Sequence, residues 1–314
     1  MSPQASTPHD TTWIQRVADA VHAYARGRKR PDETIVCASG ISPSGMIHLG
    51  NLREVMTVHL VVEELQSRGL PAEHLHSWDD FDRFRKVPAG FPETLAEFVG
   101  RPLIRVPDPS GRHPSYADRF IAEFTESLER IGVRPRAIRQ SAAYRRGDYT
   151  SAIRLTLDRR LEIFDILAAF QTPGRQSEDM GSRRDAYYPF RPYCATCDRD
   201  AAVVTGYDRS TDVLSYDCGA CHSHHDVVLG ATPLEGKLVW KIDWPMRWAR
   251  ERVDFEPAGE DHSSPQGSRA VGIRVVHDVF GGVAPFYVGY AFVGLAGAAS
   301  KMSSSGGIAP TPAT

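Results

Sequence analysis

The chain has 314 residues, of which 41% are hydrophobic and 24% charged, and its formal net charge is −2. This is the composition of an ordinary globular protein, long enough for one large α/β domain with an insertion or for two modest domains. The near-neutral charge excludes a global basic field for nucleic acid, so any RNA contact depends on local patches. No apolar run predicts a membrane span, and the polar segment 1–10 lacks the apolar core of a secretory signal. We therefore expect a cytosolic protein without a membrane or DNA partner.

The first part of the chain predicts a βαβ unit. Apolar residues recur at helical spacing over 12–26 and 51–68, whereas 34–39 and 72–78 are short runs typical of strands. The loop 40–50, rich in Gly, Ser and Pro, separates the first strand from its helix. We expect a parallel sheet with helices on both faces.

The remaining chain predicts further helices and a β-rich insertion. Expected elements are a helix capped by Ser115, a helix over 148–170, a strand over 237–242, a helix over 267–280, an apolar segment at 285–295 and a flexible end over 306–314. Residues 187–232 are rich in Cys, Asp and Tyr with short β-branched runs, which indicates a small inserted module. The expected division is an N-terminal tail and helix (1–30), a first half of the α/β domain with an insertion (31–186), the inserted module (187–232) and a second half of the α/β domain (233–314).

The loop between the first strand and its helix has the residues of a phosphate-binding site. Helix N-termini present free backbone N–H groups and a partial positive charge, and glycines let a nucleotide approach the backbone closely. His48 and Asn51 can donate hydrogen bonds to phosphate or ribose oxygens. The alternative is a plain solvent-exposed turn capped by a histidine.

The string His48-Leu49-Gly50-Asn51 resembles the HIGH signature of class I aminoacyl-tRNA synthetases. The longer segments 39–51 and 77–88, the latter containing Trp-Asp-Asp-Phe-Asp-Arg, resemble the class I lysyl-tRNA synthetases. The resemblance implies a Rossmann-like parallel sheet and an ATP site. The implied ATP-binding residues of this loop are Ser44, Gly45, His48, Gly50 and Asn51.

A second string, Lys301-Met302-Ser303-Ser304-Ser305, resembles the KMSKS loop of the same enzymes. The resemblance implies that Lys301, Ser303 and Ser304 bind ATP, and that Lys301 neutralises the charge that grows as pyrophosphate leaves. Ser304 stands at the second lysine position, and glycines follow where the family usually has a basic residue. His48, Asn51 and Lys301, together with Mg²⁺, are the implied catalytic set, without a general base.

Three aromatic strings near the end of the chain resemble the family's amino-acid pocket. They are Trp240-Lys241-Ile242-Asp243-Trp244-Pro245-Met246-Arg247-Trp248, the segment 255–262 ending in Asp-His, and 290–293, in which Ala291 replaces the usual acid. Without the resemblance, the first string is a core strand running into a helix with Pro245 at its first position. The resemblance implies that Gly40, Ser42, Trp240, His262 and Tyr290 bind the substrate.

Four cysteines predict a metal site. Cys194, Cys197, Cys218 and Cys221 follow the pattern C-x2-C-x20-C-x2-C, which suits tetrahedral Zn²⁺ in a closed, structural site. The alternative is four reduced cysteines in a knuckle that has lost its metal. Nearby histidines at 222, 224 and 225 are expected to be exposed rather than ligands.

Together these resemblances imply ATP-dependent activation of lysine and its transfer to tRNA(Lys), with the inserted module near the acceptor end of the tRNA. A glutamate substrate would need a cation in the pocket for its side-chain carboxylate, whereas the aromatic set suits a cationic side chain better. The family continues into a helical anticodon-binding region, whereas this chain stops nine residues after Ser305, so anticodon reading is not expected. A fragment, a truncated product, an adenylating paralogue with a non-tRNA acceptor and an inactive RNA-binding remnant remain open.

Overall fold

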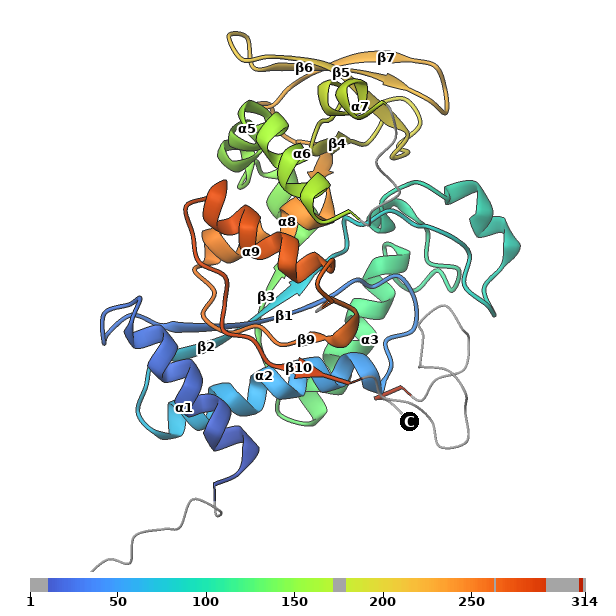
Figure 1. Ribbon diagram of the computed structural model, residues 1–314. Helices are drawn as coiled ribbons and strands as arrows, with labels where there is room; N and C mark the ends of the chain where they lie inside the picture. Colours follow the sequence, from blue (N-terminus) through green and yellow to red (C-terminus); the bar gives the residue numbers. More distant parts are fainter. Residues whose placement is uncertain (1–10, 172–178, 263, 292–310, 313–314) are drawn as a thin grey trace, which may run out of the picture.

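The computed structural model describes residues 11–171, 179–262, 264–291 and 311–312. A parallel sheet of β1 (Ile35–Ile41), β2 (Ala72–Trp78) and β3 (Arg136–Arg139) lies at its centre, in the order β1-β2-β3 (Figure 1). The expected βαβ opening is therefore confirmed. The first strand is two residues longer than expected at its carboxyl end, because Gly40 and Ile41 still pair with β2.

The sheet continues on the other side of β1 with chain from near the C-terminus. Ala38 N–H donates to the carbonyl of Phe255 at 2.7 Å, and Phe255 bridges both Cys37 and Phe286 in parallel. Beyond these bridges, β9 (Ala258–Gly259) pairs in parallel with β10 (Gly289–Tyr290). The order of strands is thus β10, β9, β1, β2, β3, and it reverses at β1. Such a reversal opens a crevice at the carboxyl ends of the strands, where α/β proteins bind ligands.

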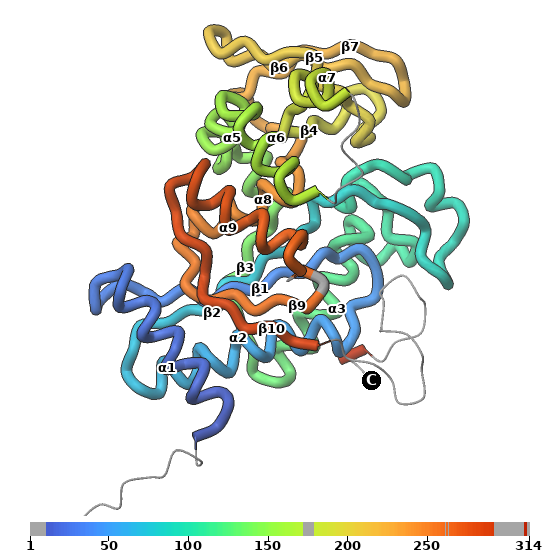
Figure 2. Tube along the Cα trace, in the orientation of Figure 1, coloured from blue at the N-terminus to red at the C-terminus, as the bar shows by residue number. Residues whose placement is uncertain are grey.

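Helices cover both faces of this sheet (Figures 1 and 2). The side chains of Ile35 and Cys37 pack in one core cluster with α1 (Trp13–Arg26) and α2 (Leu49–Ser67). Their neighbours Val36 and Ala38 pack in another cluster with α8 (Trp240–Glu251) and α9 (Ser268–Asp278). Because strand side chains alternate between faces, β1 is buried on both sides and reads as a continuous apolar run.

Predicted helix starts agree with the capping groups of the structure. Thr12 forms a capping box with Gln15 at the start of α1, and the Ser115 hydroxyl accepts from Asp118 N–H at 3.1 Å at the start of α3 (Tyr116–Arg130). The expected helix over 148–170 is instead two helices, α5 (Thr150–Asp158) and α6 (Arg160–Ala169), which meet at Arg159.

The predicted strand over 237–242 is wrong in its second half. Strand β8 (Gly236–Leu238) ends before Val239, and α8 begins at Trp240, so Pro245 is the sixth residue of a helix and not its first. Short apolar runs fit a strand and a buried helix equally well by periodicity. The apolar segment expected at 285–295 contains only the two-residue strand β10 within the described chain, and 306–314 falls almost entirely outside it.

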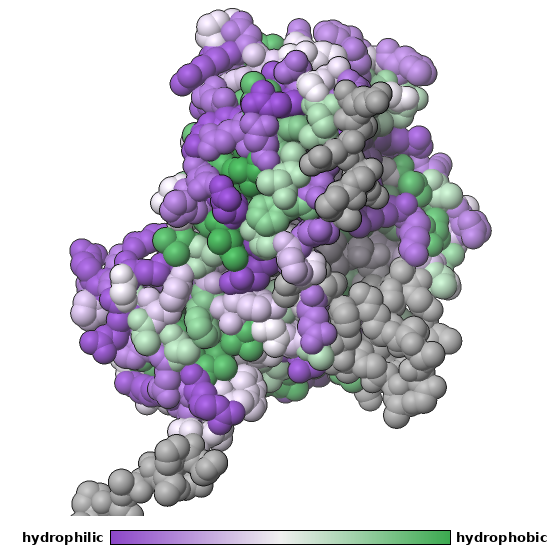
Figure 3. All heavy atoms as spheres, in the orientation of Figure 1, coloured by the Kyte–Doolittle hydropathy of each residue, from purple (hydrophilic) through white to green (hydrophobic). Residues whose placement is uncertain are grey.

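The expected β-rich module is present. Strands β5 (Ala202–Asp208), β6 (Val213–Cys218) and β7 (His224–Val228) form an antiparallel sheet, and Figure 3 shows mostly hydrophilic side chains around it. The antiparallel pair β4 (Phe190–Pro192) and β8 joins this module to the rest of the fold. The remaining elements are η1 (Glu93–Phe98), η2 (Leu103–Arg105), α4 (Gln140–Arg145), α7 (Met180–Asp185) and η3 (Glu260–His262). No helix within the described ranges is long and apolar enough to cross a bilayer.

Candidate active site

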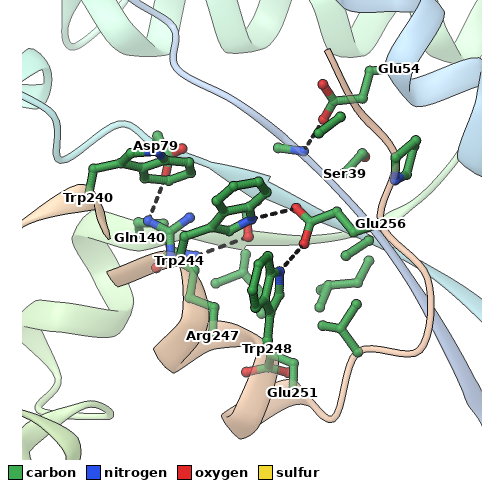
Figure 4. A pocket seen from close by; sticks show the side chains of 18 of the residues that line it. Ser39, Glu54, Asp79, Gln140, Trp240, Trp244, Arg247, Trp248, Glu251 and Glu256 are labelled. Carbon is green, nitrogen blue, oxygen red and sulfur yellow. Dashed lines mark hydrogen bonds and ion pairs between the residues drawn. The ribbon is translucent and has the colours of Figure 1, made fainter. Parts of the chain in front are cut away.

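A pocket opens at the carboxyl edge of the parallel sheet, where the strand order reverses (Figure 4). Gly40 of β1, Ser77 of β2, Ala258 of β9 and Trp240 of α8 all contribute to its wall. It holds about 660 Å³ of empty space, counted out to its open mouth. Its position is the one that the crossover topology of α/β sheets favours for ligands.

One wall of the pocket is aromatic. Trp240, Trp244 and Trp248 are spaced four residues apart on α8, so they lie on one face of that helix. The rings of Trp240 and Trp244 stack at 5.2 Å with an interplanar angle of 14°, and those of Trp244 and Trp248 lie 4.7 Å apart. His262 meets Trp244 edge-on at 5.6 Å. This wall offers π-faces to an alkyl chain or a cation.

The lining is acidic. It includes four carboxylates, those of Glu54, Asp79, Glu251 and Glu256. The same lining has a single arginine, Arg247. That arginine is already paired with Asp79 at 2.6 Å and also with Asp243 of its own helix. Glu251 lies 3.6 Å from the guanidinium of Arg136. The pocket therefore has an excess of negative groups, which favours a cationic ligand.

Two of these carboxylates are fixed by neutral donors. Glu54 accepts from Gly40 N–H at 2.9 Å and from the Tyr290 hydroxyl at 2.5 Å, and burial raises the pKa of Glu54 to about 7. Glu256 accepts from the indole N–H groups of Trp244 at 3.0 Å and Trp248 at 2.5 Å, and burial again raises its pKa.

The start of α2 follows the carboxyl end of β1 after a short loop and is capped by its own residues. His48 caps the helix: its Nδ1 accepts from Gly50 N–H at 3.1 Å, while Asn51 Oδ1 accepts from His48 N–H at 3.2 Å. Since Nδ1 is an acceptor, the neutral ring has its proton on Nε2, and burial lowers the pKa of His48. A Cβ on Gly50 would lie 2.9 Å from the imidazole, so only glycine leaves room for this ring.

The motif over 77–88 supplies two ion pairs around buried Asp80 and half-buried Asp82. Asp80 accepts from Ser141 N–H at 2.8 Å and pairs with Arg139 at 2.6 Å. Asp82 pairs with Lys237 at 2.6 Å and also interacts with the Ser42 hydroxyl. Buried carboxylates need such partners, because an unpaired charge in a low dielectric is unfavourable.

The predicted substrate-binding residues are only partly brought together. Gly40, Trp240 and His262 line the pocket, and Tyr290 contacts it through Glu54. Ser42 is held at Asp82 and does not line the pocket.

Among the predicted ATP-binding residues, Ser44 is exposed and Gly45 is buried in the loop before α2, whose first turn contains Gly50 and Asn51. Lys301, Ser303 and Ser304 lie outside the described residues.

Sequence reasoning missed the charged lining of the pocket. Asp79 and Arg247 lie inside motif strings that are otherwise rich in aromatic residues. Glu54 follows Asn51 by three residues, which places both on one face of α2, and this spacing could have indicated it. Glu256 gave no local signal, because only the pairing of Phe255 with Cys37 brings it beside β1.

The four cysteines of the inserted module converge as expected. Their Sγ atoms all lie within 4.8 Å of one another, with Cys194 and Cys221 at 3.6 Å and Cys197 and Cys218 at 3.7 Å. A regular tetrahedron with metal–sulfur bonds of ~2.3 Å has edges of about 3.8 Å. The cluster could therefore hold a metal ion.

The two cysteine turns have matching backbones and a polar surround. Asp198 and His222, which directly follow the second cysteine of each pair, have φ values of 62° and 59°. His225 bonds to the Ser223 and Thr196 hydroxyls at 3.0 Å each, so it lies beside the cysteine cluster without joining it.

Comparison with known proteins places this chain in a family. A sequence model of the family described as tRNA synthetases class I (K) matches residues 11–314. The chain belongs to this family of class I tRNA synthetases, which confirms the resemblance and the α/β fold class inferred from its motifs.

Curated relatives point in the same direction. The chain is 46% identical to a lysine–tRNA ligase of Streptomyces coelicolor, over 98% of this chain and 57% of that protein. It is 42% identical to a lysine–tRNA ligase of Thermococcus kodakarensis, over 94% of this chain and 54% of that protein. The chain thus spans about half the length of these relatives. A crystal structure of a glutamate-tRNA synthetase from Elizabethkingia anophelis matches 88% of this chain and 53% of that chain, at 16% identity and a TM-score of 0.40.

Proposed function

We propose that this chain activates L-lysine with ATP to lysyl-adenylate and transfers the lysyl group to tRNA(Lys). The observation that carries this proposal is the acidic, indole-walled pocket at the switch point of the sheet. Lysine has two ammonium groups and an alkyl stem, which suit carboxylates and aromatic faces. The carboxylates of this pocket would repel the side-chain carboxylate of glutamate, because Arg247 is already paired with Asp79 and Asp243. The lysine–tRNA ligases related to this chain support the same substrate.

The residue roles follow the motifs and the geometry. For ATP we propose Ser44, Gly45, His48, Gly50, Asn51, Lys301, Ser303 and Ser304. For the amino acid we propose Gly40, Ser42, Trp240, His262 and Tyr290. A carboxylate oxygen of lysine attacks the α-phosphorus of ATP, the bond to the β-phosphate oxygen breaks, and pyrophosphate leaves. Positioning and charge stabilisation by His48, Asn51 and Lys301 drive this step, without a general base. Mg²⁺, which binds phosphate oxygens, would neutralise the charge of the nucleotide.

We further propose that Cys194, Cys197, Cys218 and Cys221 bind a structural Zn²⁺, since their sulfur spacing fits a closed tetrahedral site. On this proposal the module 187–232 is inserted between catalytic halves 31–186 and 233–314, after the N-terminal segment 1–30, and lies near the acceptor end of the tRNA. The enzyme would work in the cytosol, where its tRNA substrate is found.

ATP–pyrophosphate exchange across the twenty amino acids, with and without tRNA, tests the activity. Exchange with lysine, followed by charging of tRNA(Lys), is the expected result. Exchange with lysine but no charging would favour an adenylating enzyme with another acceptor. Exchange with a different amino acid alone would overturn the lysine assignment, and no exchange from folded, zinc-loaded protein would favour an inactive RNA-binding remnant.

A further inference from the structure

The first cysteine turn of the inserted module, residues 194–200, lies against a segment from much earlier in the chain. This segment, residues 83–105, lies between β2 and α3 and contains η1 and η2, and we call it the arm. The backbone N–H of Asp200 donates to the carbonyl of Gly100 at 2.9 Å, and the guanidinium of Arg199 donates to a backbone carbonyl of η1 at 3.0 Å. The turn is therefore hydrogen-bonded directly to the main chain of the arm.

Ion pairs join the same two segments. Arg83 at the start of the arm pairs with Asp200 at 2.6 Å. Arg105 at its end pairs with Asp198, which directly follows the second cysteine of the turn, and with Glu235 at 2.9 Å. Each of these partly exposed pairs stabilises the fold only slightly. Together with the two backbone contacts, they dock the first cysteine turn at both ends of the arm.

The two docked segments differ in what else supports them. The arm has an apolar side, because Phe84, Leu95 and Leu103 are buried in the core cluster that contains α3. The turn has no such side, since none of residues 195–200 is buried. Its conformation depends on polar contacts and on the cysteine sulfurs, which all lie within 4.8 Å of one another. Thiolates at that separation repel one another without a cation between them, so a bound metal would order the turn.

The arm and the turn also form walls of a second cavity, which holds about 980 Å³ of empty space counted out to its open mouth. Arg83 and Arg85 of the arm line it, as does Asp200 of the turn. Trp240 lines both this cavity and the pocket at the carboxyl edge of the parallel sheet, so the two spaces are neighbours. The position of the cysteine turn therefore affects a surface next to the candidate active site.

We propose that metal binding at the four cysteines is coupled to docking of the first cysteine turn on the arm, so that the metal fixes one wall of the second cavity as well as folding the inserted module. A metal that orders the turn places Asp198 and Asp200 where Arg105 and Arg83 meet them. Because coupling between two binding events is reciprocal, the arm contacts in turn strengthen metal binding. The inference rests on the metal site proposed above and does not depend on the adenylation activity.

The first test compares the affinity of the 314-residue chain and two variants for Zn²⁺, by competition with a chromophoric chelator. The arm variant, Arg83→Gln/Arg105→Gln, removes the ion pairs to the turn and keeps all four cysteines. The matched control, Arg154→Gln/Arg209→Gln, removes two arginines that pair between α5 and the loop joining β5 to β6. That loop also belongs to the module but lies at the opposite end of β5 and β6 from the cysteines.

We expect the arm variant to bind zinc about three- to tenfold more weakly than the wild type, and the control to stay within about twofold. Removing a positive charge near a divalent cation would by itself strengthen binding, so a loss of affinity has the sign of lost docking. Equal affinities in the arm variant and the control, or tighter binding by the arm variant, would overturn the inference. A wild-type chain that binds no zinc would overturn the metal site and the inference together.

Hydrogen exchange followed by mass spectrometry tests the reverse direction without any substitution. The amides of Gly100 and Arg101 donate to carbonyls of Phe84 and Phe98, so they report on the arm itself rather than on the cysteine turn. Peptides from this part of the arm should exchange at least about threefold faster in the zinc-stripped chain than in the zinc-loaded chain, while α1 exchanges at the same rate in both. No acceleration in the arm, or equal acceleration in the arm and α1, would overturn the inference. Pyrophosphate exchange is scored separately, so a failure of the proposed activity leaves this outcome unaffected.

Discussion

Acid should destabilise this protein through two histidines that the fold keeps neutral. His74 and His76 lie on β2 and are buried, and the Ser39 hydroxyl of β1 hydrogen-bonds to both rings, at 2.8 Å and 2.7 Å. Burial lowers the pKa of each histidine from 6.5 to about 3, with a further contribution to His74 from neighbouring His76 and His59. Between about pH 3 and pH 6.5, the unfolded chain therefore binds two protons at these histidines that the folded chain does not bind.

The sign follows from proton linkage. Because the folded pKa is depressed, stability is fully present above about pH 6.5 and is lost as the pH falls from there toward 3. Each histidine costs about 1.4 kcal/mol per pH unit once the unfolded form is protonated, so the pair removes about 4 kcal/mol between pH 7 and pH 5. Glu54 acts in the opposite direction, since its raised pKa stabilises the folded state as the pH falls from 7 toward 4.5. A comparison of variants is therefore needed to separate the contribution of the histidines to the pH dependence of the unfolding free energy from that of Glu54.

Urea unfolding followed by circular dichroism, at half-unit steps from pH 7.5 to 5, measures the slope of unfolding free energy against pH. His76→Gln removes one titrating group, so its slope should be shallower than that of the wild type by about 1.4 kcal/mol per pH unit below pH 6. Ile273→Gln, at an exposed position of α9, leaves every titrating group in place; it is the control and should have the wild-type slope. A wild-type slope in His76→Gln would show that His76 ionises in the folded protein, and the reasoning would be refuted.

Three further predictions concern the site. Lysine affinity should increase about tenfold from pH 6 to pH 8 as Glu54 ionises with a pKa of about 7, and calorimetry on Glu54→Gln should show no such increase. Gly50→Ala places a Cβ 2.9 Å from the His48 ring, so the KM for ATP in pyrophosphate exchange should rise about tenfold while lysine affinity holds; an unchanged KM would contradict this role of the cap. Elemental analysis should find one zinc per chain, and Cys218→Ser should lose it and lower the thermal midpoint; a metal-free wild type of equal stability would exclude a structural zinc.

Local sequence patterns were sufficient for much of this fold. Thr12 and Ser115 cap helices because their hydroxyls accept from amides three residues ahead, an interaction within one turn. Each cysteine pair also forms a turn by local interactions, because its two cysteines are separated by only two residues. The sequence pattern gave the wrong secondary structure at Trp240. A short apolar run continues there from a strand into a helix, and only tertiary packing decides where the strand ends and the helix begins.

By itself, the sequence determined the family, the βαβ opening and the four-cysteine module, because each depends on residues close together in the chain. The tertiary structure alone decided the order of strands, which places Phe255 beside Cys37, more than 200 residues earlier in the sequence. That pairing brings Glu256 into one pocket with Glu54, where both accept hydrogen bonds from neutral donors. No local pattern encodes such a pairing, because the free energy that selects it comes from burying two faces of a sheet at once.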